Sequence, residues 1–187
     1  MTRFFFDTEF MEDGKTIELL SIGITTEDGE TFYRENREAD WNLANDWVKE
    51  NVLPHMKGSA EPYTWVRRQQ IAEDLRNWVL SRTPSNEPVE FWGYFADYDW
   101  VVLCQLFGRM VDLPNGFPMF CMDLKQFAVM VGIPRKALPA QDDTEHHALN
   151  DAIWNREAFG YLRKEMTRLY GTLLAREFLR SGSDRGE

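Results

Sequence analysis

The sequence predicts an α/β fold in which helices cover both faces of a mixed five-stranded sheet. Three observations predict this fold: the chain opens with segments typical of strands, helical periodicity then takes over, and short strands recur between later helices. The chain has 187 residues, 43% of them hydrophobic, which is enough apolar material for one packed core. We therefore expect a single domain over residues 1–180 and a frayed tail over residues 181–187.

The first predicted elements form an antiparallel meander of three strands. An apolar run over residues 3–10, with consecutive phenylalanines and two acids, is the first strand. Residues 17–24 form the second strand, an acidic turn follows over residues 27–30, and the third strand starts at residues 31–33. Strands joined by such short turns pair with their neighbours in the chain, so these three predict the antiparallel part of the sheet.

Helices and strands alternate after the meander. A helix capped by Asp40 or Asn42 is expected to end before Pro54. The further predicted elements are, in chain order, a helix over residues 67–81, a strand over residues 89–94, a helix after Asp99, a strand over residues 117–124, a helix to about residue 131, a loop over residues 134–144 and helical segments from about residue 147 to 179. Gly160 and Gly171 are expected to interrupt the last helical pattern. This order suits a sheet covered on both faces.

Charge and cysteine content exclude several classes of protein. The formal net charge is −10, which argues against a protein that clamps a long duplex, because duplex binding relies on many basic contacts to phosphate. Divalent cations would offset that charge where a phosphate sits, so an acidic enzyme that grips a strand end remains reasonable. Cys104 and Cys121 are too few for a zinc cage and are expected to be buried free thiols. No apolar run approaches the roughly 20 residues of a membrane span, and the N-terminus lacks a signal peptide's apolar stretch, so a cytoplasmic protein is expected.

Asp7 and Glu9 are the first candidate metal ligands. Residues two apart on a strand face the same side, so both carboxylates are expected to project together. Asp-x-Glu is a weak pattern by itself, since it occurs at residues 7–9, 28–30 and 143–145. Only the first lies in an aromatic run, where an unpaired charge is costly and a bound metal compensates it. An exposed face on an edge strand is the alternative.

Asp99 is the second candidate ligand, in competition with Asp97. Both follow the strand predicted over residues 89–94, where side chains emerge at the end of a sheet. The apolar stripe of the following helix places Asp99 one turn before the core-facing residues. Asp97 suits an N-cap or turn acid. We therefore favour Asp99 as the ligand.

His146 and Asp151 form the third candidate pair. The spacing His-x₄-Asp occurs here and nowhere else in the chain. Imidazole titrates near neutral pH, so His146 can accept a proton from an attacking water, and Asp151 completes a metal site. A histidine that caps a helix is the alternative. His147 is a rival base, but the fifth residue after it is Ala152, so the pairing is lost.

Together and in this order, these motifs resemble those of the DEDDh exonuclease superfamily, which includes ribonuclease T, oligoribonuclease and the proofreading exonucleases and has a ribonuclease H-like fold. The resemblance covers residues 4 to about 160. It looks closest to the polyadenylate-specific exoribonuclease AS group, through residues 6–10, 17–23, 68–71 and 98–106. One departure is Phe95, where ribonuclease T-like members have Asn four residues before the middle Asp, and this weakens transfer of their substrate contacts.

The resemblance implies a metal-dependent 3′→5′ exoribonuclease that releases 5′-mononucleotides from the 3′ ends of single-stranded RNA. It implies a preference for adenylate-rich tails, two divalent cations (Mg²⁺ or Mn²⁺) held by the four acids, His146 as the general base, and a homodimer without membrane contact. A 3′→5′ exodeoxyribonuclease that acts on single-stranded DNA ends is the alternative enzyme. A catalytically silent nucleic-acid-binding module and an acidic interaction protein are rivals from other classes.

Phe10, Trp100 and Arg68 are the candidate substrate contacts. Phe10 follows the Asp-x-Glu pair and Trp100 follows Asp99, so either ring is placed to stack on a terminal base. Their alternative role is as core or interface aromatics. Arg68, with Arg67 beside it, is a candidate phosphate contact, and a solvated helix start is the alternative.

Overall fold

The computed structural model describes residues 1–141 and 145–183, with side chains described as far as residue 172. Within these residues the strands form one six-stranded mixed sheet in the order β4-β3-β2-β1-β5-β6. Their bounds are β1 Thr2–Glu12, β2 Ile17–Thr26, β3 Thr31–Asn36, β4 Trp65–Val66, β5 Val89–Gly93 and β6 Met122–Asp123. The predicted meander is confirmed, because β1–β2 and β2–β3 are antiparallel. The other neighbours are parallel.

The predicted count of five strands is wrong by one. The additional strand, β4, has only two residues, which is too short for a period of two to be visible in the sequence. The strand predicted over residues 117–124 is likewise reduced to the two residues of β6. Both short strands lie at the edges of the sheet, where pairing depends on the chain being held alongside by other contacts.

β1 is one of the two central strands and extends past one of its neighbours. It pairs with β2 from Phe4 to Glu12, but with β5 only from Thr2 to Phe5. Beyond Phe5, the edge of β1 that faced β5 is therefore open to other parts of the chain. The acidic segment of β1 begins at this point.

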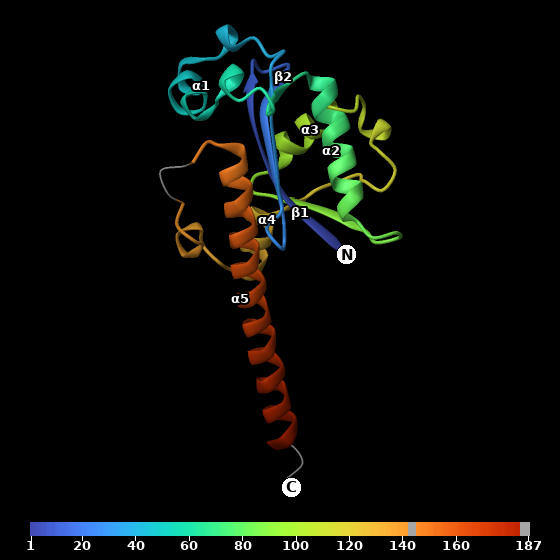
Figure 1. Cartoon of the computed structure of the whole chain (residues 1–187). Helices are drawn as coiled ribbons and strands as arrows, with labels where there is room; N and C mark the ends of the chain where they lie inside the picture. The colour runs from blue at the N-terminus through green and yellow to red at the C-terminus, as the bar shows by residue number, and fades with distance from the viewer. Residues whose placement is uncertain (142–144, 184–187) are drawn as a thin grey trace.

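Helices cover both faces of the sheet, as predicted (Figure 1). Their bounds are α1 Asp46–Asn51, α2 Arg68–Arg82, α3 Asp97–Gln105, α4 Leu124–Val131 and α5 Ala148–Ser183. Alternate residues of β1 serve the two faces: Phe4 and Phe6 pack in the cluster with the residues of α2 and α3, and Phe5 packs with those of α4 and α5. The helix predicted to end before Pro54 is divided into 3₁₀ turns and α1, and Asp40 and Asn45 cap its parts.

α5 is a continuous helix, so the predicted interruptions at Gly160 and Gly171 are wrong. A helical glycine costs only about 1 kcal/mol relative to alanine, which does not break a helix held by its neighbours. The segment from Ala148 to Leu162 packs on the sheet, and the helix then projects away from the body (Figure 1). Residues 181–183 continue α5, and the rest of the predicted tail lies outside the described residues. Among the described helices, none has the length and hydropathy needed to cross a bilayer.

Candidate active site

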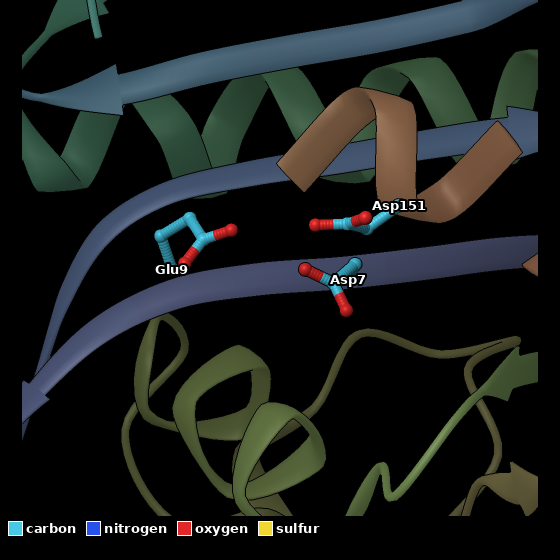
Figure 2. Close-up of side chains that lie close together, drawn as sticks. All are labelled: Asp7, Glu9 and Asp151. Carbon is cyan, nitrogen blue, oxygen red and sulfur yellow. The ribbon is translucent and has the colours of Figure 1, made fainter. Parts of the chain in front are cut away.

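Three acids from two elements meet on the α5 face of the sheet. Asp7 and Glu9 lie two apart on β1 and point to the same side, where Asp151 comes down from the first turns of α5 (Figure 2). One carboxylate oxygen from each lies within 4.8 Å of the others. Residues more than 140 positions apart in the chain are thus close enough to share one cation.

Asp99 approaches the same strand from α3. Its Oδ1 accepts hydrogen bonds from the backbone N of Thr8 at 2.9 Å and from the Thr8 hydroxyl at 2.6 Å. The backbone N of Thr8 can donate to Asp99 because β1 pairs with β5 only as far as Phe5, so that β5 does not cover this edge of β1 at Thr8. Asp99 is not one of the three acids within 4.8 Å, but its charge raises the pKa of both Asp7 and Glu9. It therefore lies beside the three-acid cluster as its fourth member.

The four carboxyl groups destabilise one another's charged forms. Burial raises the pKa of Glu9 to about 8, and the charges of Asp151 and Asp99 add to this rise. Burial also holds the pKa of Asp7 well above its usual range, reinforced first by Asp99 and then by Glu9. Burial raises the pKa of Asp99 to about 6, against the effect of its hydrogen bonds from Thr8. A bound cation would offset both the desolvation of these carboxylates and the repulsion between their charges.

The donor set fits divalent metal ions. Within the described residues, no ion pair joins any of the four acids to a lysine, arginine or histidine. Carboxylate oxygens are the ligands that Mg²⁺ and Mn²⁺ prefer. A cluster of buried acids without a basic partner is the arrangement that two-metal phosphodiester chemistry requires.

Asp151 is oriented by two hydrogen-bond donors. Gln141 donates from Nε2 to its Oδ1, and the backbone N of His146 donates to its Oδ2 at 2.9 Å. Gln141 is itself held by Arg135, whose guanidinium donates to Oε1 at 3.0 Å. Burial raises the pKa of Asp151, and the hydrogen bonds oppose this rise. The loop before α5 therefore fixes the direction in which this carboxylate points.

His146 lies at the edge of the cluster. Its backbone is in the left-handed region, with φ of 67°, and its ring contacts Trp47 of α1 edge-on at a centroid distance of 4.9 Å. The imidazole is close enough to Asp151 to oppose the rise in the pKa of that carboxyl group. Trp47 itself is 53% exposed, an unusual degree for an indole. His146 itself is half-buried beside this exposed indole.

His147 faces a different way. Its ring stacks on Tyr33 of β3 at 4.6 Å, and its Nδ1 is buried without a hydrogen-bond partner in the described chain. Burial lowers the pKa of His147. These contacts give His147 a packing role against β3, a role that the sequence left open.

The candidate substrate contacts and Asp97 occupy varied surroundings. Trp100 is 8% exposed and packs in the core between other rings, so the structure favours its alternative role as a core aromatic. Phe10 is half-buried and stacks on Tyr98, which is 54% exposed. Arg68 starts α2 and pairs with the carboxylate of Glu18 at 3.5 Å. Asp97 was expected to be an N-cap or a turn acid: Ala96 holds the N-cap position of α3, and Asp97 is an exposed acid of its first turn.

Sequence reasoning missed three residues next to the acids, Thr8, Gly23 and Gln141. Thr8 and Gln141 donate hydrogen bonds to Asp99 and Asp151, and Gly23 of β2 pairs with Asp7 of β1. Thr8 carried a signal, since it is the polar residue between the two acids of β1. Gly23 also carried one, because a glycine inside a strand pattern often marks a close backbone approach. Gln141 carried none, since a polar residue in an acidic loop has no period or spacing that singles it out.

Solved structures share this fold. Pop2p of S. pombe, in its Mg²⁺ and Mn²⁺ bound form, aligns with a TM-score of 0.56 at 15% identity, over 86% of this chain and 82% of that chain. The nuclease domain of 3′hExo, a DEDDh family member bound to rAMP, aligns with a TM-score of 0.56 at 10% identity, over 87% of this chain and 90% of that chain. The ribonuclease H-like architecture of the DEDDh nucleases is thereby confirmed.

Sequence comparison identifies the family of the chain, whereas the structural likeness shows only its fold. The family model described as the 3′-5′ exoribonuclease Rv2179c-like domain matches residues 2–162. The 3′-5′ exoribonuclease Rv2179c of Mycobacterium tuberculosis (strain ATCC 25618 / H37Rv) is 42% identical over 150 residues, which are 80% of this chain and 86% of that protein. The 3′-5′ exoribonuclease MT2234.1 of strain CDC 1551 / Oshkosh matches equally well, at 42% identity. The chain belongs to the Rv2179c-like family of 3′–5′ exoribonucleases, which confirms the predicted enzyme class.

Proposed function

We propose that this enzyme releases 5′-mononucleotides one at a time from the 3′ end of single-stranded RNA, with two divalent cations and a histidine base. The observation that carries the proposal is the meeting of half-buried Asp7 with buried Glu9, Asp99 and Asp151, none of which has a basic partner among the described residues. Four such acids have no structural use that outweighs their repulsion, whereas they form a suitable ligand set for metal ions.

Asp7, Glu9 and Asp151 would hold the metal that their oxygens surround, and Asp99 would complete the ligand set for the pair. Bound there, divalent cations supply positive charge that acidifies a water molecule and stabilises the leaving 3′ oxygen. Thr8, Gln141 and the backbone of His146 keep the carboxylates of Asp99 and Asp151 in fixed directions, which lowers the cost of assembling the site.

His146 is the residue that we assign as general base. A water oxygen forms its bond to the terminal phosphorus while its proton passes to a ring nitrogen of His146, and the bond from phosphorus to the 3′ oxygen of the preceding nucleotide breaks. That 3′ oxygen takes up a proton, and the last nucleotide leaves with its 5′ phosphate. The edge contact with Trp47 restricts the orientation of the imidazole ring.

The strand end is proposed to stack at Phe10 and Tyr98. The two rings are nearly parallel, with an interplanar angle of 10°, and Tyr98 keeps an exposed face. Base stacking on an aromatic ring contributes roughly 1–3 kcal/mol and tolerates any base. The preference for adenylate-rich tails rests on the resemblance to the polyadenylate-specific group. Arg68 enters the proposal as a phosphate contact, for which Glu18 must release it.

A homodimer and a cytoplasmic location complete the proposal. A hollow of about 240 Å³ between α4 and α5 is lined by apolar side chains that include Met130 and Tyr170, which are 84% and 61% exposed. α5 projects beyond the body at this face (Figure 1), and an unsupported helix in water is marginal, which favours a second copy as its cover. Cys104 and Cys121 are free, as suits a reducing compartment.

Digestion of labelled oligonucleotides tests the activity. Oligo-A, oligo-C and oligo-dA, each labelled at the 3′ or the 5′ end, are incubated with Mg²⁺ or with EDTA. We expect 3′-labelled oligo-A to yield labelled mononucleotide at once, 5′-labelled oligo-A to shorten stepwise, and EDTA to stop both. If oligo-dA is degraded as fast as oligo-A or faster, the alternative of an exodeoxyribonuclease replaces the proposal. If oligo-C is degraded as fast as oligo-A, the enzyme has no adenylate preference.

Two neighbouring acids provide a matched control for the site. Asp99→Asn should abolish release, because it removes a ligand, whereas Asp97→Asn should leave the rate within a factor of about two, because Asp97 is exposed on the same helix turn. Loss of activity in both variants, or in neither, would contradict the assignment of Asp99.

A further inference from the structure

Gly23 of β2 lies beneath the start of α5, directly beside the acid cluster. It pairs with Asp7 of β1 on one side and with Tyr33 of β3 on the other. Residues directly opposite in neighbouring strands share a face, so a side chain at position 23 would point toward α5, as Asp7 does. Because Gly23 has no side chain, the backbone of α5 can approach the sheet most closely at this position, directly beside Asp7.

The backbone of α5 occupies the place of the missing side chain. A Cβ atom built on Gly23 would lie 2.2 Å from the N of Leu149 and 2.3 Å from the C and O of Ala148. All three are backbone atoms, so a rotamer change cannot relieve the overlap. Ordinary contact begins at 3.4 Å, and any side chain at this position must lift the first turn of α5 by the difference.

Lifting that turn would move the third metal ligand. Asp151 follows Leu149 by two residues on the same helix, and its carboxylate reaches down to Asp7 and Glu9 (Figure 2). The next turn is clamped separately, because Nδ2 of the buried Asn155 donates to the carbonyl of Phe6 at 2.9 Å. Gly23 and Asn155 therefore fix the depth of α5 on either side of Asp151.

We infer that Gly23 is a positioning residue for the metal site: its lack of a side chain lets α5 lie close enough for Asp151 to share a cation with Asp7 and Glu9. The inference rests on the proposed function, since it concerns the same acids. It assigns to a residue without functional groups a measurable effect on metal affinity.

Metal binding to the full chain is the direct test, with Mn²⁺ alone as the probe. Binding is measured by isothermal titration and by the rise in melting temperature that Mn²⁺ causes. Gly23→Ala should weaken Mn²⁺ binding at least tenfold. Gly160→Ala is the matched control, because it makes the same change on the open side of α5, where nothing lies within 4 Å, and it should leave binding unchanged.

A second substitution should restore what the first removes. Asp151→Glu lengthens the ligand by one methylene group, so it should weaken Mn²⁺ binding in the wild-type background and strengthen it in the Gly23→Ala background. A purely structural role for Gly23 would give no such rescue. Asn155→Ala removes the hydrogen bond from α5 to the carbonyl of Phe6 without introducing a steric clash. It should loosen the packing of α5 on the sheet and weaken Mn²⁺ binding severalfold.

The outcomes separate the two proposals. If the wild-type protein itself binds no Mn²⁺, the proposed function fails. If the wild type binds and Gly23→Ala binds equally well, or if Asp151→Glu weakens both backgrounds alike, the positioning role is overturned while the metal site stands. A Gly23→Ala protein that does not fold, combined with unchanged binding in Asn155→Ala, would also overturn it, since the glycine would then serve the sheet alone.

Discussion

Replacing Glu9 by Gln is expected to stabilise the metal-free protein while it removes metal binding. The folded state raises the pKa of Glu9 from an ordinary value of 4.5 to about 8, mainly through burial. Between these two pH values the unfolded state is ionised and the folded state retains a proton. The ionisation of Glu9 therefore lowers stability as pH rises through this window, by about 1.4 kcal/mol per pH unit, and this contribution levels off above pH 8.

The size of the effect follows from that window. At pH 7 the wild-type protein has lost roughly 3 kcal/mol relative to a protein whose residue 9 does not titrate. Glutamine has nearly the same shape as glutamate and carries no charge, so Glu9→Gln should recover most of the free energy of unfolding that the ionisation of Glu9 removes. For a chain of this length, a gain of that size corresponds to a rise in melting temperature of roughly 6–12 °C.

Thermal melts in EDTA between pH 5 and 8 measure the prediction. The wild-type melting temperature should fall across the range, and that of Glu9→Gln should fall less. Glu12→Gln is the control, since Glu12 lies at the exposed end of the same strand and its replacement should change stability by no more than about 0.5 kcal/mol. The reasoning is refuted if Glu9→Gln is less stable than the wild type in EDTA at pH 7, or if wild-type stability rises from pH 5 to pH 8.

Three further predictions follow from the surroundings of the acids. His146→Ala should fold normally and bind Mn²⁺, but release mononucleotides on the order of 10²–10⁴ times more slowly, and a full rate would remove its role as base. Trp47→Ala should lower kcat with little effect on Mn²⁺ binding, whereas Trp47→Phe should keep most of the rate; equal rates in the two variants would show that the ring contact is irrelevant. Thr8→Val removes a hydrogen bond that lowers the pKa of Asp99, so the pH at which Mn²⁺ stabilises the protein half-maximally should rise, while Thr8→Ser should match the wild type.

Local pattern was sufficient to single out the acids that the structure brings together. Asp7 and Glu9 were predictable as a pair because the period of a strand places them on one face whatever the strand pairs with. The His146–Asp151 spacing and the position of Asp99 were recognisable because each lies at the junction of a predicted strand or loop with a helix. Local pattern also misled: Gly160 predicted a break in a helix that the core holds intact, and the short β4 left no periodic signal.

The sequence by itself determined the order of the main elements, the two faces of β1 and the four acids that the structure gathers. The tertiary structure alone decided how closely the acids meet. Thr8 reaches Asp99 only because β5 ends early, and Asp151 reaches β1 only because Gly23 lets a helix backbone rest on the sheet. The physical reason is that periodicity and propensity act over a few neighbouring residues, whereas the separation of distant side chains is set by the packing of whole elements against one another.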